Sequence, residues 1–225
     1  MPNRLFDVIT FDCYGTLIDW ETGIAEAFLA AARGDGVVLD RGAVLAAYAE
    51  VEPAVEAGGY RPYREVLAET AVEVARRLGW LLTREGARFL PESLLRWRPF
   101  PDTGPALEAL RSAGYALGIL SNVDDDLLAG TLAHFPVRFD LLVTAQQVGS
   151  YKPAHGHYLE ARRRLAGRRW LHAAQSYFHD VEPAAALGVP VVWVNRKGER
   201  PGGAARPEGE VRDLAAMVAW LGEGR

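Results

Sequence analysis

The sequence predicts an α/β fold in which a Rossmann-like parallel sheet, flanked by helices, forms the core and an all-helical domain is inserted after the first strand. Three observations indicate this fold. Short apolar runs alternate with helical patterns, several runs end in polar residues, and residues 20 to 97 show helical patterns without a convincing strand. We therefore expect a core domain of residues 1–17 and 98–225 and a helical cap domain of residues 18–97.

The core strands are expected in five apolar runs. Each run is short and too uniformly apolar to alternate between a buried and an exposed face, which is typical of strands covered on both sides. Because helical segments separate the runs, successive strands are expected to lie parallel, joined by right-handed crossovers. The runs cover residues 6–11, 115–122, 139–145, 170–176 and 189–195.

Helices are expected wherever apolar residues recur at helical spacing. The cap crossings near residues 18–20 and 96–101 are expected to act as hinges that let the cap close over the core. The cap helices are predicted at residues 23–34, 41–58, 63–79 and 84–97. The core helices are predicted at residues 104–114, 154–167, 182–188 and 211–222, with an exposed loop at 197–209.

Composition limits the function classes. With 49% hydrophobic and 24% charged residues, the 225-residue chain can bury a substantial core. A net charge of −4 gives no reason to expect a nucleic-acid or anionic-membrane partner, and no apolar stretch approaches the roughly 18 residues of a membrane span. The single cysteine, Cys13, excludes an intrachain disulfide. We expect a cytoplasmic protein without a signal peptide, and a homodimer is left open.

Polar side chains gather where the predicted strands end. The carboxyl ends of parallel strands meet at one edge of a sheet, and ligands bind outside that edge. These side chains supply two carboxylates, an ammonium and small hydrogen-bonding groups. They are Asp12, Thr16, Ser121, Asn122, Lys152 and Asp180.

Asp12 is the most informative of these residues, because it ends a buried strand and precedes a tight turn. Partial burial should raise the pKa of its carboxyl, and an ammonium such as that of Lys152 should oppose this shift. The backbone N–H groups from Cys13 to Gly15 are candidates for binding an anion. Taken alone, Asp12 is better explained as a cap for the turn that follows it.

Four motifs together carry a family resemblance. "DCYGTL", "LSN", "YKP" and the late "HD" resemble, in order and spacing, the motifs of the haloacid dehalogenase superfamily, and the helical insert resembles its cap. The resemblance implies that Asp12 is a nucleophile that forms a covalent aspartyl intermediate. It implies that Lys152 keeps this nucleophile ionised, that Thr16 and Ser121 position oxygens of the substrate or nucleophile, and that Asp180 belongs to the acidic fourth motif.

Within the superfamily, two residues argue against phosphoryl transfer. Phosphatases carry an aspartate two places after the nucleophile as general acid, and this chain has Tyr14, a weak acid, at that place. Phosphatases also bind Mg²⁺ through an acidic residue about five places before the last aspartate, where this chain has Gln175. A metal site here would have to use Asp12 and Asp180.

The pattern resembles the 2-haloacid dehalogenases more closely. They share "D-x-Y-G-T", the pair Ser121 and Asn122, and a tyrosine six residues after the lysine, here Tyr158. The resemblance implies metal-free attack on the carbon that bears the halogen, and a departing halide needs no proton. Where these enzymes have Ser and Asn in the fourth motif, this chain has Gln175 and Tyr177. Their cap also presents an arginine to the halide.

The sequence does not fix that cap arginine, and we take Arg61 and Arg64 as candidates for substrate contact. The residues of the core that the resemblance assigns to substrate binding are Tyr14, Thr16, Ser121, Asn122 and Tyr158. The interpretation is a hydrolase of a small 2-haloacid or related small carboxylate, a small anionic substrate, with no cofactor. The alternatives are a Mg²⁺-dependent phosphatase of a small phosphomonoester and a catalytically idle member that binds a small anion or a protein.

Several other residues are of types that can carry chemistry, but each also has a purely structural explanation. Cys13 is expected to be a packing thiol, because its side chain points away from that of Asp12. His155 and His157 are expected at the surface, on different faces of a helix. His179 is equally suited to orienting Asp180 and to packing. The acids of Asp124–Asp126 are expected to favour a helix N-terminus.

Overall fold

The computed structural model describes residues 4–222, and the chain divides into two compact units. One unit comprises Met1–Ile18, Pro99–Asn122 and Leu132–Arg225, and the other comprises Asp19–Arg98 and Val123–Thr131. We call them the core unit and the cap unit and describe each by itself. Residues 123–131, which the sequence analysis assigned to the core, cluster with the cap unit.

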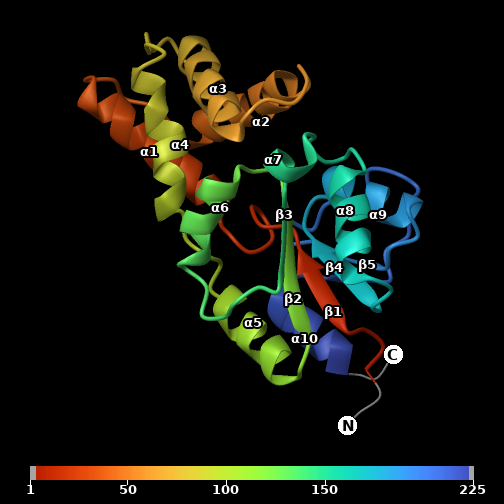
Figure 1. The fold of residues 1–225 in the computed structure, drawn as a ribbon. Helices are drawn as coiled ribbons and strands as arrows, with labels where there is room; N and C mark the ends of the chain where they lie inside the picture. The colour runs from red at the N-terminus through yellow and green to blue at the C-terminus, as the bar shows by residue number, and fades with distance from the viewer. Residues whose placement is uncertain (1–3, 223–225) are drawn as a thin grey trace. The chain divides into compact units, whose positions relative to one another are not determined.

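The core unit contains a parallel sheet, which confirms the predicted fold class (Figure 1). Within residues 4–222 its strand order is β3-β2-β1-β4-β5-β6, and every neighbouring pair is parallel. β1 lies between β2 and β4, so the residue after β1 emerges between the ends of two neighbours. The strands are β1 Val8–Phe11, β2 Ala116–Ser121, β3 Leu141–Thr144, β4 Trp170–Ala174, β5 Val191–Val194 and β6 Gly209–Val211.

Helices of the core unit pack against this sheet. α8 packs over β2 and β3, whereas α10 packs beside α5 and against β5 and β6 (Figure 1). β1, β4 and β5 are buried along their whole length, as expected for strands covered on both faces. The helices are α5 Thr103–Ser112, α7 Ala145–Val148, α8 Gly156–Leu165, α9 Glu182–Ala186 and α10 Leu214–Gly222, and Tyr177–Val181 forms a π-helical turn.

The C-terminal region corrects the sequence prediction. The loop expected at 197–209 ends in a short strand, β6, and the last helix begins at Leu214 rather than at residue 211. The first residue of β6 is Gly209, and only a glycine fits there without a shift, because a Cβ would lie 2.8 Å from the indole of Trp220. A three-residue strand that begins with glycine carries too little β-branched or aromatic pattern to be predicted.

The cap unit is helical, as predicted for residues 18–97. Asp19 and Asp40 begin α1 and α2 by accepting hydrogen bonds from the backbone N–H groups of Thr22 and Ala43. The predicted helix at 84–97 is instead broken into short pieces. The elements are α1 Trp20–Gly34, α2 Arg41–Glu56, α3 Tyr63–Arg77, α4 Phe89–Ser93 and the 3-10 turns Gly86–Arg88 and Leu94–Arg96, while α6 Asp125–Leu132 begins within this unit.

Asp124 and the two acids that follow it stabilise the N-termini of two helices. Asp125 and Asp126 lie in the first turn of α6, which confirms the predicted preference of these acids for a helix start. Asp124 is buried and accepts hydrogen bonds of 2.8 and 3.0 Å from the backbone N–H groups of Tyr63 and Arg64. It therefore caps α3 from a distant part of the chain.

No helix within residues 4–222 combines the length and the apolar character that a membrane crossing requires.

Candidate active site

The turn after β1 holds Asp12 at the carboxyl edge of the sheet. The backbone N–H of Asp12 donates to Ala173 O at 3.1 Å, so the ladder to β4 continues to this residue. Gly15 has a φ of 99°, which side-chain-bearing residues rarely adopt, and its N–H donates to Ile18 O at 2.8 Å. That bond turns the chain back sharply. It also engages the Gly15 N–H, which the sequence analysis had considered for anion binding.

Thr16 binds the Asp12 carboxylate from the other side of this turn. Its hydroxyl donates to Asp12 Oδ2 at 2.9 Å and accepts from the backbone N–H of Gln175 at 2.9 Å. Thr16 is fully buried, and Asp12 retains 7% exposure. The predicted positioning group therefore orients the Asp12 carboxylate in the structure.

Lys152 joins Asp12 to Asp180. Its Nζ donates to Asp12 Oδ1 at 2.9 Å, to Asp180 Oδ1 at 2.7 Å and to Leu120 O at 3.0 Å, which uses all three ammonium hydrogens. The side chain of Lys152 is 1% exposed. A cation this deeply buried is stable only with paired charges and satisfied hydrogen bonds, and both are present here.

Asn122 fixes the segment that carries Lys152. Its Oδ1 accepts from the Lys152 backbone N–H at 2.7 Å, and its Nδ2 donates to the Lys152 carbonyl at 3.1 Å. The sequence analysis named Asn122 as a substrate-binding residue. The structure shows its amide hydrogen-bonded at both ends to the backbone of Lys152, which places that lysine, and contact of Asn122 with substrate stays a prediction.

Asp180 is completely buried in the π-helical turn. Its Oδ1 accepts from Lys152, from the hydroxyl of Tyr158 at 2.9 Å and from His172 Nε2 at 3.1 Å. Within residues 4–222 its other oxygen, Oδ2, has no hydrogen-bond partner. Tyr158, predicted to bind substrate, is also buried and lies against Asp180.

The two carboxylates have opposite pKa shifts. Burial raises the pKa of Asp12, although the charge of Lys152 and its hydrogen bond oppose this shift. Burial would also raise the pKa of Asp180, but Lys152 and the hydrogen bond from His172 outweigh it and hold that pKa well below its usual range. Burial lowers the pKa of Lys152, yet the two carboxylates overcome this effect and raise it. The ammonium therefore persists at neutral pH.

The end of β2 brings a further buried polar group to this edge. Ser121 is fully buried, and within the described part of the chain its hydroxyl has no hydrogen-bond partner. Its backbone carbonyl accepts from His157 Nε2 at 3.0 Å. The prediction of a surface position for His157 is wrong. The ring is buried, and desolvation, assisted by the charge of Lys152, lowers its pKa to about 3.

The remaining residues of the first and fourth motifs are placed as follows. Cys13 is buried, and burial raises its pKa well above the usual value, so the thiol is neutral and packs in the core as predicted. Tyr14 is half-buried. Gln175 donates from Nε2 to Glu199 at 3.3 Å, and the hydroxyl of Tyr177 donates to backbone carbonyls of the 203–205 segment.

The hydrogen bonds of His179 go to Ser176, while Asp180 acts on its ring through its charge. Its Nδ1 lies 3.0 Å from Ser176 Oγ, and its backbone N–H donates to the same oxygen at 3.1 Å. Ser176 therefore caps the π-helical turn. Burial lowers the pKa of His179.

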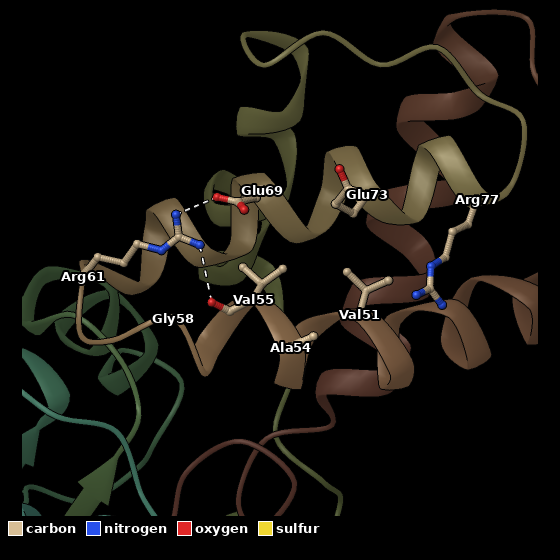
Figure 2. Close-up of a pocket in the computed structure, with 8 residues that line it drawn as sticks. All are labelled: Val51, Ala54, Val55, Gly58, Arg61, Glu69, Glu73 and Arg77. Atoms are coloured by element: carbon tan, nitrogen blue, oxygen red, sulfur yellow. Dashed lines mark hydrogen bonds and ion pairs between the residues drawn. The ribbon is translucent and has the colours of Figure 1, made fainter.

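The cap candidates Arg61 and Arg64 form ion pairs within their own unit. Arg61 donates to Glu69 at 2.6 Å at one end of an open cavity of about 440 Å³ between α2 and α3 (Figure 2). Arg64 pairs with Asp126 and lies 3.4 Å from Asp124. Contact of either guanidinium with substrate stays a prediction.

The donor set suits Mg²⁺ poorly. Within residues 4–222, no group of three or more His, Cys, Asp or Glu side chains is arranged to hold a metal ion. Asp12 and Asp180 both direct Oδ1 to the Lys152 ammonium, and Gln175 supplies a neutral amide where a carboxylate would be preferred.

His172 is the site residue that sequence reasoning missed. It lies in β4, is fully buried and contacts Asp180. The available signal was an imidazole inside an otherwise apolar strand, two residues before the strand end, where burial demands a polar partner.

Comparison with known proteins identifies the family. The family model of haloacid dehalogenase-like hydrolases matches residues 6–200. The chain belongs to this family. It is thus a haloacid dehalogenase-like hydrolase, as the motifs "DCYGTL", "LSN", "YKP" and "HD" predicted.

Individual proteins and solved structures are also similar to this hydrolase. It is 31% identical to (S)-2-haloacid dehalogenase H-109 of Pseudomonas putida over 222 residues, covering 95% of this chain and 96% of the relative. The crystal structure of the L-2-haloacid dehalogenase PA0810 superposes with a TM-score of 0.81 at 27% identity, covering 97% of this hydrolase and 99% of that protein. A shorter match, 33% identity over 105 residues, joins 44% of the chain to 45% of a glyceraldehyde 3-phosphate phosphatase of Methanothermobacter thermautotrophicus.

Proposed function

We propose that this hydrolase removes halide from a small 2-haloacid through a covalent ester on Asp12, without a metal ion. The observation that carries the proposal is the placement of Asp12. Its carboxylate retains some exposure at the carboxyl edge of the sheet, while Thr16 and Lys152 bind one oxygen each. A carboxylate held in this way is oriented for attack, and the ammonium favours its ionised form.

In the first step, an Asp12 oxygen attacks the carbon that bears the halogen. A new C–O bond forms as the C–halogen bond breaks, and the halide leaves with the bonding electron pair. No proton has to reach the leaving group, which agrees with Tyr14 at the place where a phosphatase has its general acid.

In the second step, water attacks the ester carbonyl carbon of Asp12. The bond between that carbon and the ester oxygen breaks, one water proton is transferred to the departing oxygen to give the hydroxy acid, and the other proton is released to solvent. The aspartate keeps the oxygen of the water. Asp180 is the base we assign to this water, because its Oδ2 has no partner among the described residues and its Oδ1 shares the Lys152 ammonium with Asp12.

The substrate is a small anion, and Ser121 is the group of the core unit that we assign to binding it. The Ser121 hydroxyl is a buried donor without a partner within residues 4–222, and such groups are costly unless a ligand or water satisfies them. Two relatives that this chain covers over at least 95% of their length are (S)-2-haloacid dehalogenases, and their names support this substrate class.

The test measures halide and phosphate release from a panel of 2-haloacids and aryl phosphates, with added Mg²⁺ and with a chelator. We expect halide release that the chelator leaves unchanged and that Asp12→Asn abolishes. A single turnover in ¹⁸O-water should place the label in Asp12, detected by mass spectrometry of the peptide. Phosphate release that the chelator abolishes would instead support the phosphatase, and no turnover of any substrate would support the idle member.

A further inference from the structure

A buried chain of hydrogen bonds leads through the sheet to Asp180. Trp170 Nε1 donates to Thr10 Oγ1 at 2.6 Å, Thr10 Oγ1 lies 2.8 Å from His172 Nδ1, and His172 Nε2 lies 3.1 Å from Asp180 Oδ1. Thr10 and His172 are register partners on β1 and β4, and Trp170 lies two residues earlier on β4, so it shares the same face. Thr10, His172 and Asp180 are fully buried, and Trp170 is 8% exposed.

The direction of each hydrogen bond follows from the hydrogens available. The indole N–H of Trp170 can only donate, so Thr10 Oγ1 accepts from it. The acceptor that the described residues offer to the hydroxyl hydrogen of Thr10 is His172 Nδ1. Nδ1 is then the unprotonated nitrogen of the ring, and Nε2 carries the hydrogen that is donated to Asp180.

We propose that His172 is a positioning residue, held by Trp170 and Thr10 as the neutral Nε2–H tautomer, which fixes the Asp180 carboxylate through Oδ1 and leaves Oδ2 for the reaction. The alternative imidazolium would direct a second N–H at Thr10 and leave the threonine hydroxyl hydrogen without an acceptor in a dry interior. The opposite tautomer would direct the His172 Nε2 lone pair at a carboxylate oxygen.

The surroundings of the ring support this assignment. Tyr158 packs edge-on against His172, with ring centroids 5.4 Å apart, while its hydroxyl donates to the same Oδ1 of Asp180. Three donors, Lys152, Tyr158 and His172, therefore converge on one oxygen of Asp180. With Oδ1 saturated, the carboxylate cannot rotate without breaking all three bonds, which keeps Oδ2 in one place.

The catalytic part of this inference rests on the proposed function, in which Asp180 serves the hydrolysis of the Asp12 ester. The assignment of the His172 tautomer is independent of the proposed function. The experiment therefore has one readout in the resting protein and one during turnover, so that failure of the dehalogenase proposal and failure of this inference can be told apart.

In the resting protein, ¹⁵N NMR of the five histidines reports which ring nitrogen carries hydrogen. We expect the His172 resonances, assigned by their absence from His172→Phe, to show an unprotonated Nδ1 and a protonated Nε2. Thr10→Val should shift these resonances, because it removes the hydroxyl with little change of shape. Thr131→Val is the matched control, since that buried hydroxyl donates to Leu127 O within its own helix.

A second resting-state readout is the carboxyl ¹³C titration of Asp180. His172→Phe should raise the pKa of Asp180, because one donor to its ionised form is lost. His172→Gln should largely retain the wild-type pKa, since a glutamine amide N–H can take the place of Nε2–H.

During turnover of a 2-haloacid, His172→Phe should lower kcat about 10- to 100-fold with little change in KM, the loss that corresponds to one hydrogen bond to a charged group. His172→Gln should recover most of it, and the Asp12 ester should accumulate in His172→Phe. A protonated Nδ1 in the wild type, or equal kcat and equal Asp180 titration in the Phe and Gln variants, would overturn the inference. Absence of halide release with the expected NMR result would overturn only the proposed function.

Discussion

Lys152 Nζ lies 2.9 Å from Asp12 Oδ1, although 140 positions of sequence separate the two residues. The same nitrogen lies 2.7 Å from Asp180 Oδ1. A single ammonium thus serves two buried carboxylates, one with some exposure and one without any. The opposite pKa shifts come from the other partners of the two carboxylates: the charge of Asp180 adds to the effect of burial on Asp12, whereas the hydrogen bond from His172 adds to the effect of Lys152 on Asp180. The remaining exposure of Asp12 supports the proposal that Asp12 rather than Asp180 attacks the substrate.

Removing the ammonium should destabilise the fold. Lys152→Met leaves Asp12 and Asp180 close together without a counter-charge, and breaking a buried pair in this way costs about 3–5 kcal/mol. Urea unfolding checks the free energy of unfolding. Lys197→Met, at an exposed lysine, is the control and should change little. A Lys152→Met protein as stable as the wild type would show that one carboxylate is protonated in the native state.

The pH dependence of turnover should follow Asp12. The pKa of Asp12 is raised, and in the proposed mechanism only the carboxylate attacks. The value of kcat/KM should therefore fall as the pH drops through a value above 3.8, the ordinary aspartate pKa. Circular dichroism at each pH separates this loss from acid unfolding. On the alkaline side, the raised pKa of Lys152 should keep the ammonium and sustain turnover through mildly basic pH. An acid limb at or below 3.8 would contradict the burial of Asp12.

The sequence predicted the parts of the site that motifs carry. Asp12, Thr16, Lys152 and Asp180 lie where strands end, and parallel topology alone requires such ends to meet. Sequence reasoning could not tell that Asn122 holds the Lys152 backbone, because both roles suit an amide at a strand end.

The residues that sequence reasoning misplaced depend on long-range contacts. His157 was expected at the surface, but its ring fits beneath the end of β2 and binds Ser121 O. His172 and Thr10 form a pair across two strands, and register is not visible in a single strand pattern. Asp124 caps α3, a helix that begins some 60 positions earlier, and no local capping rule connects them.

Arg196 should stabilise the turn that follows Asp12. Its guanidinium donates to Thr16 O at 2.8 Å, pairs with Asp102 at 2.9 Å and lies over the ring of Phe100 at 4.0 Å. The Arg196 side chain is only 11% exposed. Arg196→Met should lower the free energy of unfolding by about 1.5–3 kcal/mol, measured by urea titration, because charge-assisted hydrogen bonds to Asp102 are lost.

Acid should erase part of this difference. Burial alone would raise the pKa of Asp102. The hydrogen bonds that its carboxylate accepts, those from Arg196 foremost, together outweigh burial, so the pKa in the folded protein lies below the ordinary value. A lowered pKa contributes stability that is present above the unfolded pKa and is lost as the pH falls through the folded pKa. The gap between wild type and Arg196→Met should therefore narrow in acid. Arg163→Met, which removes the exposed pair with Glu160, is the control and should change little at any pH.

Gly23 tests the packing of the cap unit, because helix propensity and sterics give opposite expectations there. Replacing a glycine within a helix by alanine would ordinarily raise the free energy of unfolding by roughly 0.5–1 kcal/mol, and Gly23 is the fourth residue of α1. A Cβ at Gly23, however, would lie 2.8 Å from Trp97 Cδ2 and closer still to its Cγ. That indole cannot move aside easily, since it is buried and its Nε1 donates to Ser93 Oγ at 3.0 Å.

We expect overpacking to outweigh helix propensity at Gly23. Gly23→Ala should therefore lower the free energy of unfolding by about 1–3 kcal/mol, measured by thermal or urea unfolding. Gly34→Ala, at the end of the same helix, is the matched control, because a Cβ there would have no heavy atom within 4 Å. The control should leave stability unchanged or raise it slightly. If Gly23→Ala were as stable as Gly34→Ala, the indole of Trp97 would have to pack differently from the arrangement described, and the close approach of α1 to residues 93–97 would not determine cap stability.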